Sequence, residues 1–97
     1  MKTAETRDRY LDAVRSQWAA IVGACEVWEH KRPIVLFDVS EGKIFYVHSY
    51  AGFRAELSPG GQASLARQYE RAEREGQIVV FFRDNERRKL VSYSLDR

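Results

Sequence analysis

The sequence predicts an α+β fold in which helices cover a mainly antiparallel sheet, and three observations support this prediction. A regular seam of apolar residues occupies the N-terminal third of the chain. Two pairs of strand-forming runs follow, each pair joined by a short polar turn, and a segment with helix start and stop signals stands between the pairs. We therefore expect the element order α-β-β-β-α-β-β in a layered α/β sandwich.

The length and composition indicate one folded domain spanning residues 1–97. A chain of 97 residues has room for a single modest core, and 44% hydrophobic with 31% charged residues is typical of a globular domain with a densely charged surface. The formal net charge of +2 is far from the basic excess that phosphate-binding proteins use. The net charge therefore does not exclude nucleic acid as a partner, but it does not indicate one either.

The single cysteine and the absence of long apolar runs predict a cytoplasmic protein. One cysteine cannot form an internal disulfide, and small domains made for oxidising compartments usually carry several. No stretch approaches the roughly 20 apolar residues that a membrane-spanning helix needs. We expect neither secretion nor a membrane partner.

A long first helix is predicted to begin within residues 3–6 and to end within residues 28–30. Apolar residues recur every three or four positions, which is the spacing of one helical face. The seam consists of Leu11, Val14, Trp18, Ile21, Cys25 and Trp28. Pro33 then disfavours helical geometry at the residue before it.

Residues 33–39 and 43–50 are predicted to form a β-hairpin around Ser40-Glu41-Gly42. A two-residue loop would pair Phe37 with Tyr46 and Val35 with His48. Residues 53–57 alternate apolar and charged side chains, which predicts a short third strand at the sheet edge.

The second helix is predicted to start at Ser58-Pro59 and to stop at Gly76. Serine caps helix N-termini, proline is tolerated at the first helical position, and glycine favours the left-handed conformation that ends helices. Residues 77–83 and 88–95 then predict a second hairpin, with Val80 beside Val91 and Ile78 beside Tyr93.

The sequence predicts no enzyme, no metal and no cofactor. Cys25 lies in the helical seam, where a thiol behaves as a small hydrophobe. One cysteine and two histidines without paired spacing do not make a zinc site, and no nucleophile motif is present. No catalytic residue is therefore assigned.

The main functional indication is that both faces of the predicted sheet are apolar. Either the two helices divide between the faces, or a partner covers what they leave open. The second interpretation predicts a non-enzymatic protein-interaction module, an adaptor, assembly factor or inhibitor that binds a protein partner and self-associates as a homodimer. The predicted partner-binding residues are Tyr46, His48, Tyr50 and Phe53, with Arg54, Arg87 and Arg88 as a polar rim.

Two other functions remain open at this stage. A nucleic-acid binder would stack bases on strand aromatics and contact phosphates through an arginine-rich hairpin tip. Its basic residues would be Arg54, Arg83, Arg87, Arg88 and Lys89. A small-ligand sensor would instead use a cleft between the second helix and the sheet.

Overall fold

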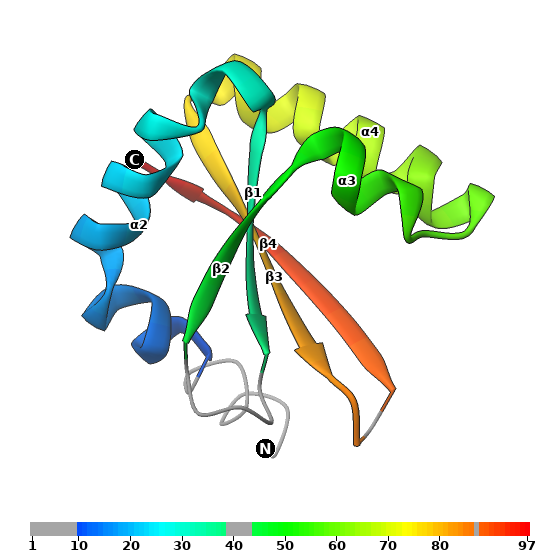
Figure 1. The fold of residues 1–97 in the computed structure, drawn as a ribbon, viewed down its shortest axis with the longest axis horizontal. Coiled ribbons are helices and arrows are strands. Elements are labelled where there is room, and N and C mark those ends of the chain that lie inside the picture. The colour runs from blue at the N-terminus through cyan, green and yellow to red at the C-terminus, as the bar shows by residue number, and fades with distance from the viewer. Residues whose placement is uncertain (1–9, 39–43, 87) are drawn as a thin grey trace.

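The computed structural model describes residues 10–38, 44–86 and 88–97, and a four-stranded sheet with the strand order β2-β1-β3-β4 forms its centre (Figure 1). The outer pairs β1–β2 and β3–β4 are antiparallel hairpins, whereas the central strands β1 and β3 run parallel. The α+β class is therefore confirmed. The elements are α2 (Trp18–Val27), the 3₁₀ turn η1 (Glu29–Lys31), β1 (Pro33–Asp38), β2 (Phe45–Ser49), α3 (Tyr50–Ala55), α4 (Pro59–Glu75), β3 (Gln77–Asp84) and β4 (Lys89–Asp96).

The helices divide between the two faces of the sheet. Figure 1 shows α2 on one side and α3 with α4 on the other. One core joins Ile21 and Cys25 of α2 to Val35, Val80 and Phe82 of the sheet. The second core, on the opposite face, is formed by Ile34, Leu36, Phe53, Leu65, Tyr69, Ala72, Val79 and Phe81. The chain's own helices thus account for much of the apolar surface on both faces, as the first of the two interpretations expected.

The first helix keeps its predicted seam but is interrupted. Residues 10–16 are helical, Gln17 is a turn residue with φ −120° and ψ 14°, and α2 follows. The seam continues across the break because Val14, Ile21 and Cys25 are all buried. The predicted start within residues 3–6 lies outside the described residues.

The predicted third strand is wrong, because residues 50–55 form the helix α3. Ser49 caps this helix, and its Oγ accepts a hydrogen bond from the Gly52 N–H at 3.1 Å. Phe53 and Leu57 are four residues apart, so the alternation that suggested a strand also fits one helical face. Tertiary contacts favour the helix, since Phe53 is buried in the second core and Leu57 packs against it.

The second helix has the predicted ends. The Ser58 Oγ accepts a hydrogen bond from the Gly61 N–H at 3.2 Å, and Pro59 is the first residue of α4. Gly76 ends the helix in the left-handed conformation with φ +67°. The described residues contain no helix with the length and apolar character required to traverse a bilayer.

Both hairpins form, with registers that differ from the prediction. In the first, Val35 pairs with Val47 and Phe37 with Phe45, a shift of one residue. A shift of one residue exchanges the faces of the sheet, so Tyr46 lies on the side of Leu36. The predicted turn at residues 40–42 lies outside the described residues.

The second hairpin is shifted by two residues, so that Val80 pairs with Tyr93 and Ile78 with Leu95. Because side chains alternate with a period of two, this shift leaves each residue on its predicted face.

Candidate functional site

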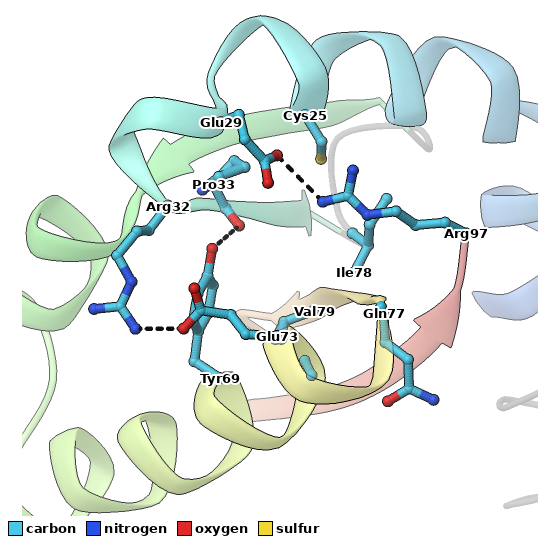
Figure 2. A pocket seen from close by; sticks show the side chains of 12 residues that line it. Cys25, Glu29, Arg32, Pro33, Tyr69, Glu73, Gln77, Ile78, Val79 and Arg97 are labelled. Carbon is cyan, nitrogen blue, oxygen red and sulfur yellow. Dashed lines mark hydrogen bonds and ion pairs between the residues drawn. The ribbon is translucent and has the colours of Figure 1, made fainter.

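Two hollows lie at opposite ends of the parallel strands β1 and β3. The first is at the amino ends of these strands and has a volume of about 190 Å³. Its charged groups are partly exposed but pair with one another, and for this pairing we name it the closed cavity. Figure 2 shows side chains from α2, η1, α4 and the sheet converging on it. The polar members of the closed cavity are Cys25, Glu29, Arg32, Tyr69, Glu73, Gln77 and Arg97.

The charged groups of the closed cavity are paired with one another (Figure 2). The Arg32 guanidinium meets the Glu73 carboxylate at 2.9 Å, and Arg97 meets Glu29 at 3.3 Å. Arg32 also stacks over the ring of Tyr69, with 4.7 Å from its Cζ to the ring centroid. The Tyr69 hydroxyl donates a hydrogen bond to the Pro33 carbonyl at 3.3 Å. These contacts connect α4 to the start of β1 and connect η1 to the end of β4.

The two weak acids of the closed cavity keep their protons. Burial raises the pKa of the Cys25 thiol to about 11. Burial, followed by the nearby Glu73 carboxylate, raises the pKa of the Tyr69 hydroxyl to about 12. A protonated, buried thiol is a poor nucleophile. The contacts of the closed cavity therefore favour a structural role, because its charged groups pair with one another.

The second hollow, here named the basic pocket, is at the carboxyl end of β3 and has a volume of about 250 Å³. It lies between the α3–α4 corner and the β3–β4 hairpin. Its residues are Phe53, Glu56, Leu57, Arg83, Asp84, Asn85, Arg88, Lys89 and Leu90. The pocket therefore combines an apolar wall with three cationic and two acidic side chains.

Arg83 occupies this pocket because the strand alternates. Val79 and Phe81 belong to the second core, so Arg83, two residues further along β3, lies on the same face of the sheet. Phe81 packs against Phe53 with tilted rings whose centroids are 4.7 Å apart, and Phe53 lines the pocket.

The Arg83 guanidinium has no partner among the described residues. Its Nε is buried and lacks a hydrogen-bond acceptor, and its side chain forms no ion pair with Glu56 or Asp84, the two acidic residues of the pocket. Leaving a buried donor unsatisfied costs about 1–3 kcal/mol. The basic pocket thus contains a hydrogen-bond donor with no acceptor among the described residues. The charged groups of the closed cavity are paired.

A third candidate region is the free edge of β2. In the described residues β2 pairs only with β1, and Phe45–Ser49 contains neither charge nor proline. Tyr46 is 44% exposed, and Ile44 just before the strand is also exposed. Edge strands are usually protected by charge, proline or bulges. Within Phe45–Ser49, the edge lacks protective charge and proline.

The structure separates the predicted partner-binding residues. Tyr46 and His48 lie on β2, and the His48 ring is tilted against Phe53 at 6.1 Å. Phe53 itself is only 3% exposed and belongs to the core. Tyr50 packs edge-on against Tyr69 at 5.2 Å, beside the closed cavity.

The predicted polar rim is likewise divided. Arg54 is exposed on α3, and its carbonyl accepts a hydrogen bond from Gln62 at 3.1 Å. Arg88 lines the basic pocket together with Phe53. Arg87 lies outside the described residues.

Sequence reasoning placed Arg83 only in the nucleic-acid alternative. The signal that could have singled it out is a charged side chain continuing the alternation of Val79 and Phe81 into the covered face. That alternative also needs exposed strand rings: Phe81 and Phe82 are buried in the two cores, whereas Tyr46 on β2 is exposed. Within residues 10–38, 44–86 and 88–97, no three histidine, cysteine or acidic side chains gather as a metal site.

No family model, curated protein or solved structure matches this chain. Its own geometry is therefore the basis for a functional assignment.

Proposed function

We propose that the protein is a non-enzymatic protein-interaction module that forms a homodimer through the free edge of β2. The observation that carries this proposal is the uncharged, proline-free edge formed by Phe45–Ser49, with Tyr46 exposed upon it. About half of the backbone N–H and C=O groups of an edge strand point away from its neighbour. Pairing with another strand satisfies them and buries the adjoining side chains.

A second copy of the same strand is a suitable occupant of this edge. In an antiparallel pair related by a two-fold axis at Val47, Phe45 lies opposite Ser49 and Tyr46 lies opposite His48 of the other copy. Each Tyr46–His48 contact then occurs twice, as the symmetry requires. Both four-stranded sheets become one sheet of eight strands.

The other free edge is less suited to this pairing. β4 carries Lys89 and Asp96 at its ends. Its Ser92 donates a hydrogen bond to Gln68 of α4 at 2.9 Å, and Gln68 donates to Ser94 at 3.3 Å. This edge is therefore polar and tied to the neighbouring helix.

A charge-exchange experiment at Val47 tests the proposal. Val47 is half-buried and belongs to neither core, so its substitution should leave the fold intact. In the symmetric pair, V47K places two lysines side by side, and V47E does the same with two glutamates. We expect each variant to dissociate at least about tenfold more readily than the unmodified protein, and an equimolar mixture to associate again.

The measurement is solution mass by light scattering over a range of concentrations. The matched control is V91K, because Val91 is a half-buried valine on the β4 edge and also lies outside both cores. The unmodified protein and V91K should approach the mass of two chains. A one-chain mass at every concentration, equal dissociation of V91K, or a mixture that stays monomeric would each overturn the proposal.

A further inference from the structure

We infer that the basic pocket is a binding site for a small organic carboxylate. The first support is Arg83, whose buried Nε has no acceptor in the described part of the chain while the side chain as a whole stays partly exposed along the pocket. Glu56 and Asp84 line the same pocket and do not pair with Arg83. A carboxylate that enters the pocket would supply an acceptor for this guanidinium.

The charge and shape of the pocket favour a carboxylate. A planar guanidinium presents two parallel N–H groups that match the two oxygens of a carboxylate. Among the described lining residues, three cationic side chains, Arg83, Arg88 and Lys89, exceed the two acidic ones by one positive charge. A single negative charge matches this balance better than a phosphate dianion does.

The apolar wall indicates that the ligand carries a hydrocarbon body. Phe53, Leu57 and Leu90 line the pocket beside the charged groups, and Leu90 is exposed. Ligand pockets typically combine such a wall with a few polar groups that fix orientation. The pocket also lies at the carboxyl end of a parallel strand, where α/β proteins commonly bind ligands.

This site is independent of the proposed homodimer. In the sheet order β2-β1-β3-β4, the edge of β2 and the β3–β4 hairpin lie at opposite margins. Pairing through β2 leaves the pocket accessible. Failure of one proposal therefore does not decide the other.

The test is a titration with 3-phenylpropionate, followed by NMR at the arginine Nε–Hε signals. We expect a saturable shift of the Arg83 signal with a Kd of about 1 mM, a value in keeping with a probe of this size. The neutral 3-phenylpropionamide, which has the same body without the charge, should give at least tenfold weaker binding. Phenyl phosphate should also bind more weakly.

Variants of the pocket show which side chains contribute to binding of the probe. We expect R83M to weaken binding by more than tenfold and R83K, which keeps the charge but loses the planar fork, by about three- to tenfold. K89Q alters an exposed side chain, so it tests the site even if changes at Arg83 disturb folding, and we expect a two- to threefold loss. The control is R54Q, because Arg54 is exposed and lies outside the pocket lining.

Several results would overturn the inference. One is an Arg83 signal that does not move with the carboxylate. Others are equal binding of the amide, an equal loss in R54Q, or unchanged binding in both R83K and K89Q. Tighter binding of phenyl phosphate would show that the assignment to a carboxylate is wrong.

Discussion

The arginines at the two ends of the central parallel strands differ in whether they are paired. At the amino ends, Arg32 is paired with Glu73 and lies over the rings of Tyr50 and Tyr69. At the carboxyl end of β3, Arg83 has no partner within residues 10–38, 44–86 and 88–97, although its Nε is buried. The closed cavity thus satisfies its charges within the chain, and the basic pocket does not. We infer from this difference that the closed cavity stabilises the fold and that the basic pocket can bind a ligand.

The largest effect is expected at Tyr69, which joins the contacts of the closed cavity. Its ring is buried in the second core and its hydroxyl bonds the Pro33 carbonyl. We expect Tyr69→Ala to lower the free energy of unfolding by about 3–5 kcal/mol, measured by urea denaturation. Val27→Ala shortens an exposed side chain of α2 outside both proposed sites and should cost less than about 1 kcal/mol. Similar losses in the two variants would contradict the structural role of the closed cavity.

The closed cavity should also make the protein sensitive to alkaline pH. The folded chain raises the pKa of Cys25 from 9.0 to about 11 and that of Tyr69 from 10.0 to about 12. The folded state therefore binds these protons more tightly than the unfolded state does. The associated stability is fully present below pH 9 and is lost as the pH rises from 9 toward 12.

We expect the free energy of unfolding to fall by on the order of 2 kcal/mol between pH 8 and pH 10.5, with Cys25 as the main contributor. Urea denaturation in the presence of a reductant measures it. In Cys25→Ala the decline between pH 9 and 10 should flatten, whatever the variant's stability at pH 7. An unchanged slope in that variant would show that the thiol is not responsible.

The sequence predicts those elements whose signals are local. Ser58 and Gly76 mark the ends of α4 because capping depends on the residue itself and its nearest backbone neighbours. The seam through Ile21 and Cys25 likewise identifies a buried helical face. Both features are readable without knowing the rest of the fold.

Features that depend on distant contacts were not predictable. Residues 53–57 fit either a strand or one face of a helix, and the Ser49 cap together with packing of Phe53 against Phe81 favours the helix over residues 50–55. The parallel pairing of β1 with β3 joins residues more than 40 positions apart. It brings the end of β3 beside the α3–α4 corner, so the basic pocket could not be assembled from neighbouring residues alone.

The smallest expected effect is also the most direct comparison of the two ends, because the same substitution is made at each. Arg32→Met removes an exposed ion pair and the stacking on two rings, and should cost about 1 kcal/mol. Methionine keeps an unbranched stem and meets the same backbone constraint at φ 54°, so the loss reports on the guanidinium. Arg83→Met removes a buried donor for which the described residues supply no acceptor, and should leave stability unchanged or raise it by up to about 1 kcal/mol. Urea denaturation of both variants at pH 7 measures the difference. If Arg83→Met is the more destabilising of the two, Arg83 stabilises the fold, and the proposed difference between the closed cavity and the basic pocket is wrong.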